Sequence, residues 1–336
     1  MSSPPEPMAN PELVGHDAAA GQLRDASRGG RPHHGWLVAG PAGVGKATLA
    51  WRYARWVMAG MPGGAGTPLR VAPEDPVFRR VAAGAHADVR GITPGLGEKG
   101  KKVIIRVEDV REVPRFLSMT PAEGGWRVVV VEDADGMNEP AQNALLKTLE
   151  EPPARAVLLL TTSAPDRLLP TIRSRVRRLD LFPLDAAAMG GLLGAWLPEM
   201  GEGDRASLAT LSGGCPGRAL TLAEGEGLEL ARDVAAFLDS LPRPDARGLH
   251  ALADRIAGKR DGTVLLTFFD LLRDALARAL RAAGRGQGAP GWLSFRGLSE
   301  WAAVWEALGR IADDTELLNL DRKGAVLAGL SRMAAP

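Results

Sequence analysis

A glycine-rich stretch near the amino end has the spacing of a loop that binds phosphate. The sequence GPAGVGKATLA covers residues 40–50, and a lysine follows its glycines. In such a loop the backbone N–H groups and the start of the next helix point toward an anion, while the lysine reaches the β and γ phosphates of a nucleotide. The stretch predicts a phosphate site made by Gly40, Gly43, Gly45 and Lys46.

The residue after the lysine does not complete this site. A phosphate loop that works with Mg²⁺ has Ser or Thr at that position, because the hydroxyl is a ligand of the metal. This chain has Ala47 there, and Thr48 comes one residue later. One residue is a rotation of about 100° on a helix, so the Thr48 hydroxyl points elsewhere. We therefore expect a degenerate loop, with binding of ATP or ADP without hydrolysis left open.

Two carboxylates follow an apolar run in VVVVEDAD, residues 128–135. In phosphate-loop enzymes one such carboxylate is a partner of Mg²⁺ and the other polarises the attacking water. Glu132 takes the metal side and Asp133 the water side, which reverses the usual order of Asp and Glu. The exchange moves each carboxylate by about one C–C bond, or ~1.5 Å, and a misplacement near ~1 Å costs about 10²-fold in rate. The exchanged carboxylates are a second departure, beside Ala47, from the pattern of an ATP-hydrolysing site.

These groups need strands and helices to position them, and the apolar pattern supplies both. Short apolar runs without alternation are typical of parallel strands buried on both faces. Apolar residues that recur every three or four positions indicate helices, and Pro152-Pro153 end one of them. We expect strands over 36–39, 103–107, 128–131 and 156–163, and helices over 12–30, 48–60, 108–119 (broken) and 139–153. Strands that alternate with helices predict an α/β sheet domain.

After about residue 182 the pattern indicates helices only. Aromatic residues near the end of the chain are best explained as helix packing. We divide the chain into a disordered segment, an α/β domain, a small helical domain and a larger helical domain, over residues 1–11, 12–182, 183–226 and 227–336.

Composition excludes several classes of protein. The chain has 336 residues, 45% hydrophobic and 24% charged, with a net charge of +1, so no overall field favours nucleic acid or a membrane. Cys215 is the only cysteine and the five histidines are scattered apart from His33 and His34, so we expect no disulfide, no zinc and no other metal site. No run reaches the roughly 18 apolar residues that span a bilayer. The chain is expected to be a soluble cytoplasmic protein without membrane contact.

Two longer stretches carry a family resemblance. HHGWLVAGPAGVGKATLA begins at residue 33, and the sequence from Trp126 to Leu179 contains NALLKTLEEPP and TIRSR. Together they resemble the clamp-loader branch of the AAA+ family, most closely in the bacterial DNA polymerase III clamp loader. The resemblance implies a P-loop AAA+ parallel-sheet domain, a small helical lid and a C-terminal all-helical collar domain that mediates oligomerisation.

The resemblance also implies roles for single residues. SRV at 174–176 matches the family's Ser-Arg-Cys signature, so Arg175 would be an arginine finger that acts in trans on ATP bound to a neighbour. Thr162, next to Ser163, falls at the first sensor position. A lid arginine is expected near residue 217, but this chain has Gly217, and Arg218 is a doubtful substitute one residue later.

Partners follow from the same resemblance. They are the other clamp-loader subunits (delta and gamma/tau), the sliding clamp indirectly, and primer–template DNA within the complex.

Glu150 and Glu151 lie at a helix C-terminus, where the helix dipole disfavours anions. We expect them to face a basic neighbour in the assembled ring.

Three interpretations of function remain open. The first is a structural clamp-loader subunit that does not itself hydrolyse ATP and presents Arg175 to a neighbouring ATPase. The second is an ATPase motor of the same fold, like gamma/tau. The third, a P-loop kinase or other phosphotransferase, leaves the helical second half of the chain unexplained.

Overall fold

The described residues form one parallel sheet with helices on both faces, followed by a second unit made of helices. The computed structural model describes residues 4–27, 29, 31–63, 66–94, 105–123, 125–259 and 262–334. They divide into two compact units, one up to Arg218 and the other from Ala219 onward. The fold class expected from the sequence is confirmed, while the finer division at residues 182 and 226 stays a prediction.

All strands of the sheet run in the same direction. Their order is β2-β3-β4-β1-β5, and every neighbouring pair is parallel. The strands are β1 (Gly35–Ala39), β2 (Val89–Ile92), β3 (Arg127–Val131), β4 (Ala156–Thr162) and β5 (Arg177–Asp180). Because the strands are parallel, their carboxyl ends share one edge of the sheet and their amino ends share the other.

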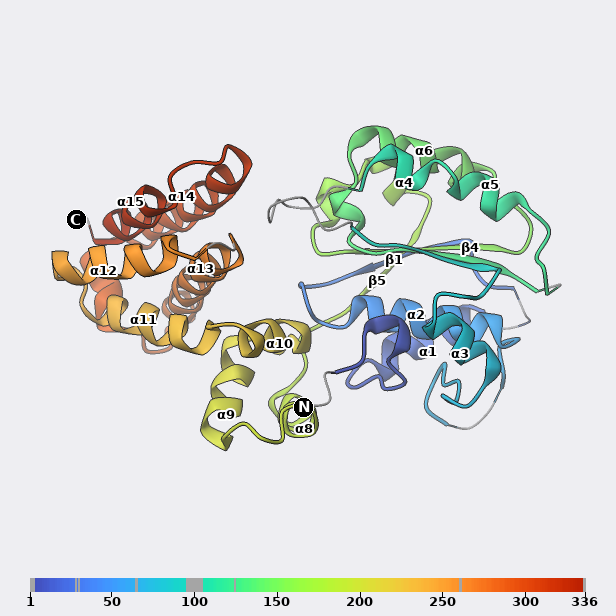
Figure 1. The fold of residues 1–336 in the computed structure, drawn as a ribbon, viewed down its shortest axis with the longest axis horizontal. Coiled ribbons are helices and arrows are strands. Elements are labelled where there is room, and N and C mark those ends of the chain that lie inside the picture. The colour runs from blue at the N-terminus through green and yellow to red at the C-terminus, as the bar shows by residue number, and fades with distance from the viewer. Residues whose placement is uncertain are drawn as a thin grey trace. The chain divides into compact units, whose positions relative to one another are not determined.

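Along β1, β3 and β4, side chains alternate between two apolar cores. On β1, Trp36 and Val38 pack with the first core and Leu37 packs with the second. Helices α1 to α3 cover the first face and α4 to α6 cover the second, as Figure 1 shows. These helices are α1 (Asp17–Ala26), α2 (Lys46–Met58), α3 (Pro76–Ala82), α4 (Val107–Val110), α5 (Val113–Ser118) and α6 (Glu139–Glu150). A short helix, α7 (Pro170–Arg173), precedes β5.

Local sequence explains where α6 begins and ends. The Asn138 side chain accepts a hydrogen bond from the Ala141 N–H, and proline occupies the first turn. Both features favour a helix start. Pro152-Pro153 prevent the helix from continuing. Glu150 is therefore the last residue of α6.

Three segments differ from the sequence expectations. Strands β2 and β5, the outermost two of the sheet, were not predicted because neither has a strong apolar pattern: β2 contains Gly91, and in β5 only Leu179 is buried. The strand predicted over 103–107 is wrong where it is described. Ile105 forms an isolated bridge with Met137, and Val107 begins α4; residues 103 and 104 lie outside the described part.

The sequence predicts a disordered tail over residues 1–11, whereas residues 4–11 fold onto α2. Pro7–Ala9 form a short 3₁₀ helix. Arg55 donates to the Met8 and Asn10 carbonyls, and Arg52 donates to the Pro11 carbonyl. Two buried guanidinium groups thereby gain backbone partners. The helix expected over 12–30 is also shorter, because α1 covers only Asp17–Ala26.

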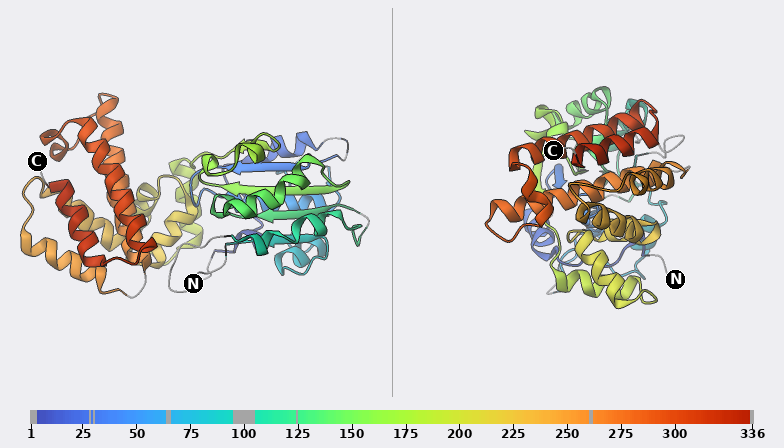
Figure 2. Two further views of the ribbon diagram at one scale, coloured as in Figure 1. Left: turned by 90° about the horizontal axis from the view of Figure 1, so that it is seen from above. Right: turned by 90° about the vertical axis from the view of Figure 1, so that its left-hand side faces the viewer.

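Helices make up the rest of the described chain. In the first unit, α8 (Ala186–Trp196) packs against α9 (Glu202–Leu211), and α10 (Pro216–Glu224) begins there. In the second unit α13 packs against α11 and α14, while α15 packs against α12 and α14 (Figure 2). These helices are α11 (Gly227–Asp239), α12 (Ala246–Ala257), α13 (Gly262–Gly284), α14 (Leu298–Leu317) and α15 (Arg322–Ala334).

Candidate functional site

The glycine loop lies at the carboxyl edge of the sheet, between β1 and α2. Gly45 is the residue before α2 and has φ 111°, and Gly43 has φ 74°. Side chains disfavour both values, so glycine is needed for this turn. The loop brings the amino end of α2, with its backbone N–H groups and positive dipole, to the position where a phosphate would bind. Ala47 and Thr48 lie in the first turn of α2, and both are half-buried.

Lys46 is bonded to its own loop. Its Nζ donates to the Gly40 carbonyl (3.1 Å), the Pro41 carbonyl (2.9 Å) and Ser163 Oγ (2.8 Å). The residue is only 5% exposed. Burial lowers the pKa of Lys46, while Asp133 and Asp135 raise it. A nucleotide would have to displace these contacts before the ammonium could reach its phosphates.

His16 holds the loop from the side of α1. Its Nε2 lies 2.8 Å from the Val44 carbonyl, and the ring is buried. A Cβ added to Gly45 would lie 3.4 Å from the same nitrogen. The imidazole therefore occupies the space beside the loop, a contact that the sequence did not predict.

Glu132 is bonded to a tryptophan of α2. Its Oε1 accepts a hydrogen bond of 2.7 Å from Trp51 Nε1. Burial raises the pKa of Glu132, and the indole N–H lowers it. Glu132, the carboxylate expected on the metal side, thus has one oxygen hydrogen-bonded to the neutral indole N–H of Trp51.

The neighbouring polar groups are also bonded within the chain. The Asp133 backbone has φ 46°, and its N–H donates to Thr161 Oγ1 (2.9 Å). Burial raises the pKa of the Asp133 carboxyl, and Lys46 lowers it. Thr162, predicted as a sensor, is fully buried and donates to Asp135 Oδ1 (2.7 Å), which also accepts from the Ser163 N–H (3.0 Å). Sequence reasoning missed the role of Asp135, although it belongs to the same acidic run.

The start of α10 lies directly against the glycine loop. The Gly217 N–H donates to the Gly43 carbonyl (2.8 Å). A Cβ on Gly217 would lie 2.9 Å from Gly43 Cα, and one on Gly43 would lie 2.5 Å from the Arg218 N atom. The backbones therefore meet where the family resemblance expects a lid arginine, and no side chain fits at 217 without movement.

Arg175 lies at the opposite edge of the sheet, just before β5. Its NH2 lies 2.9 Å from Glu150 Oε1, while its NH1 donates to the Thr171 carbonyl (2.9 Å) and to Ser174 Oγ (3.2 Å). About a third of the side chain is exposed. Within the chain Glu150 pairs with Arg175, and the expectation that Glu150 and Glu151 face a basic neighbour in the ring stays a prediction.

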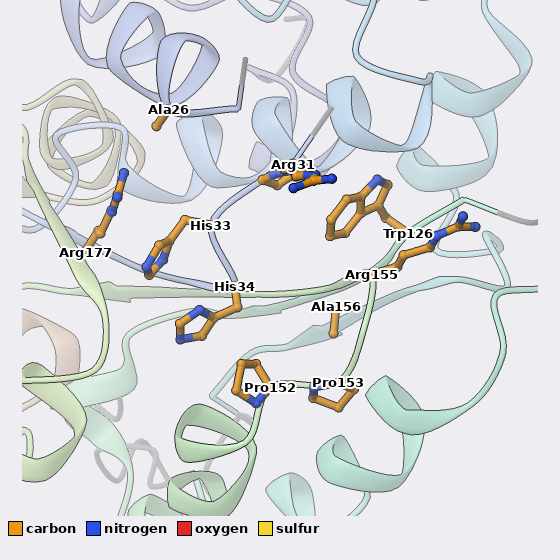
Figure 3. Close-up of a pocket in the computed structure, with 11 residues that line it drawn as sticks. Ala26, Arg31, His33, His34, Trp126, Pro152, Pro153, Arg155, Ala156 and Arg177 are labelled. Atoms are coloured by element: carbon orange, nitrogen blue, oxygen red, sulfur yellow. The ribbon is translucent and has the colours of Figure 1, made fainter. Parts of the chain in front are cut away.

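A basic pocket of about 340 Å³ opens at the same amino edge. Figure 3 shows Arg31 and Trp126 on one side of it, and Pro152 and Pro153 on the other. Its other lining residues include two histidines and two further arginines: His33, His34, Arg155 and Arg177. Among the described residues, none that lines it carries a carboxylate.

The charges around this pocket act on His33. Burial lowers the pKa of His33, its hydrogen bond with the Gly35 backbone raises it, and the charges of His34 and Arg177 lower it. The arginines stay charged at neutral pH and give the pocket positive potential. The amino edge thus suits an anionic neighbour, whereas at the carboxyl edge Lys46, Glu132 and Thr162 are bonded within the chain.

The described residues contain no group of three or more His, Cys, Asp or Glu placed to hold a metal ion. None of their helices is long and apolar enough to cross a membrane.

Comparisons with known proteins agree on one family. Residues 15–185 match the family described as "DNA polymerase III, delta subunit". The delta-prime subunit of Pseudomonas aeruginosa is 40% identical over 207 residues, 61% of this chain and 60% of that protein. The Escherichia coli delta-prime subunit is 35% identical over 258 residues, 76% of this chain and 73% of that one. The chain therefore spans less than two thirds of the first relative and almost three quarters of the second.

A solved structure supports the fold alone. A protein from Thermotoga maritima related to the gamma subunit of DNA polymerase III superposes with a TM-score of 0.50 at 20% identity. The match covers 94% of this chain and 98% of that one.

Gly217→Ala tests the contact between α10 and the loop. We expect it to lower the free energy of unfolding by about 1–3 kcal/mol, because the new methyl group collides with backbone. Chemical denaturation measures this. Gly190→Ala in α8, where a Cβ meets nothing within 4 Å, is the control and should be neutral or stabilising. A Gly217→Ala protein as stable as the parent would contradict the assigned contact.

Glu132→Gln tests the buried carboxylate through pH. Because burial raises the native pKa, protonation of Glu132 stabilises the fold. This stabilisation is complete below the ordinary value of 4.5 and is lost as the pH rises through the native pKa. The variant should be more stable than the parent at pH 7, with a shallower fall in stability above pH 4.5. Thermal unfolding against pH measures both, with the exposed Glu74→Gln as control; parallel curves for Glu132→Gln and parent would refute the assignment.

Proposed function

The chain belongs to the family of DNA polymerase III delta-prime clamp-loader subunits, and on that premise we propose that it is a structural subunit of the loader that acts on a neighbour's ATP. In this proposal it helps to hold the ring together and presents Arg175 to the γ-phosphate of ATP on an adjacent ATPase subunit. The observation that carries the proposal is the bonding of Lys46 Nζ to two loop carbonyls and Ser163. The loop lysine is thus engaged within the chain.

The residues present do not fit a Mg²⁺–ATP hydrolysis site. Ala47 offers no metal ligand, and Glu132 is bonded to Trp51. Gly217 abuts the loop where a lid arginine would act. We therefore propose that the chain does not hydrolyse ATP, and that any binding of ATP or ADP is weak and structural.

Arg175 suits a role in trans. A planar guanidinium can stabilise the charge that builds on a γ-phosphate, and such fingers contribute about 10³–10⁵-fold in rate. The arginine lies far from this chain's own loop, because the two occupy opposite edges of a parallel sheet. The basic pocket beside β5 adds positive potential on the same edge.

The partners proposed are those of the clamp loader. They are the delta and gamma/tau subunits by direct contact, the sliding clamp indirectly, and primer–template DNA through its backbone inside the complex. A replication role implies the cytoplasm.

An ATPase motor like gamma/tau is the second candidate. It is favoured by the retained loop glycines and by Lys46 at the start of α2. Membership of the clamp-loader family removes the support for a P-loop kinase or other phosphotransferase.

Arg175→Ala tests the finger in a complex reconstituted with the ATP-hydrolysing subunits. Assembly should be unchanged, because about a third of the side chain is exposed and the residues that it bonds with lie at the surface. Turnover at the single nucleotide site that Arg175 completes should fall by about 10³-fold or more. In a single-turnover experiment, the amount of ATP hydrolysed in the fast phase should therefore fall by the contribution of one site.

The matched control is Arg173→Ala, two residues away in α7. Arg173 is exposed and pairs with Asp166 (3.0 Å), so its loss should leave turnover unchanged. Turnover unaffected by Arg175→Ala would reject the proposed function.

Lys46→Ala separates the two candidates in the purified chain. The structural role predicts no ATP turnover above background for either protein. A motor predicts turnover that disappears in the variant. Release of phosphate, followed in a coupled assay, decides between them.

A further inference from the structure

A carboxylate at the end of α6 breaks a rule of helix electrostatics. The carboxyl end of a helix carries partial negative charge, so an anion there is unfavourable by a few tenths of a kcal/mol. Glu150 is nonetheless the last residue of α6. Departures of this kind call for a compensating interaction, and the structure contains one.

Glu150 and its neighbours fix both ends of the Arg175 guanidinium. NH2 lies 2.9 Å from Glu150 Oε1, and NH1 donates to the Thr171 carbonyl and Ser174 Oγ. Ser174 Oγ donates in turn to the Thr171 carbonyl (3.1 Å). A guanidinium carries five N–H donors, so these three contacts leave donors for an incoming anion.

The backbones that carry the pair are held together at the start of β1. A Cβ on Gly35 would lie 3.1 Å from Val176 Cγ1 and 3.2 Å from Leu149 Cδ2. These residues flank Arg175 and Glu150 in the chain, and Leu149 is 3% exposed. The two charged side chains therefore project from rigidly packed positions, which a precisely placed catalytic group requires.

Exposure leaves the pair accessible from outside. The Arg175 side chain is 34% exposed and the Glu150 side chain 48%. Solvent weakens such a pair, so its main effect is to select one orientation of a flexible side chain rather than to stabilise the fold.

We propose that Glu150 is a positioning residue for the arginine finger. It holds the Arg175 guanidinium at the amino edge in the orientation that meets a γ-phosphate of the adjacent subunit. The inference rests on the proposed function, since it needs Arg175 to act in trans.

The experiment is a double-mutant cycle in the reconstituted complex. Glu150→Gln, Arg175→Ala and the double variant are compared with the parent by complex assembly and by single-turnover ATP hydrolysis, at several ATP concentrations, at the site that Arg175 completes. The kcat and KM are those of that site. Glu150→Gln should lower kcat by about two- to fivefold, the range that exposed ion pairs contribute. KM should not change, because the contact matters in the transition state. In the Arg175→Ala background the same substitution should have no effect.

Glu151→Gln is the matched control. Because Glu151 is itself expected to face a neighbouring subunit, the effect of this substitution on assembly is measured first, and Asp166→Asn serves as the activity control. Asp166 is an exposed carboxylate that pairs with Arg173 (3.0 Å), so its loss should leave kcat unchanged. Glu150→Asp keeps the charge but shortens the side chain, and it should restore part of the loss.

Every other result overturns the inference. An equal loss with and without Arg175 would mean that Glu150 acts on folding or assembly. A rise in kcat would mean that Glu150 sequesters the arginine. No loss in Glu150→Gln, with a clear loss in Arg175→Ala, would reject the positioning role alone. No loss in Arg175→Ala would reject it together with the proposed function.

Discussion

Burial of a parallel sheet on both faces is the constraint on which the rest of the first unit depends. The three central strands, β1, β3 and β4, are buried throughout, so their neighbouring polar side chains collect at the strand ends. The chain crosses from the amino to the carboxyl edge along β1, and Gly35 and Gly40 lie at its two ends. β1 thus runs from the end of the sheet where Arg175 lies to the glycine loop at the other end. The parallel sheet therefore keeps Arg175 and the groups around Lys46 apart.

The two edges differ in how their charges are satisfied. At the carboxyl edge, Lys46, Glu132 and Thr162 are buried or half-buried, and each has a partner within the chain. Buried polar groups without partners are costly, which favours this closed network. At the amino edge, Arg175 and the pocket arginines remain open to solvent in part. The arginines of the amino edge are therefore available to an anionic group of another molecule.

Sequence patterns predicted the parts of the fold that carry strong local signals. The valine run of β3 and the spacing and proline stop of α6 are such signals, and the glycine loop was found at its strand–helix junction. The contacts that decide the chemistry join residues far apart in the chain. Trp51 and Glu132 are separated by 81 residues, and a helical pattern marks such a tryptophan only as apolar, without the direction of its N–H. The pairing of Glu150 was likewise hidden, because a dipole argument identifies an unfavourable charge but not its partner.

Ala47 and Gly217, which replace the hydroxyl and the arginine expected in a nucleotide site, each make room for a bond within the chain. Without a hydroxyl at Ala47 to help hold a metal, a half-buried Glu132 needs another donor, and Trp51 supplies it. Without a lid arginine, the backbone at Gly217 can approach Gly43 and bond its carbonyl. A nucleotide would therefore satisfy no unmet bond of Lys46 and would have to break three, each involving a charged group and contributing about 1.5–3 kcal/mol. These internal bonds join the loop to the first residue of α2 and to the start of α10.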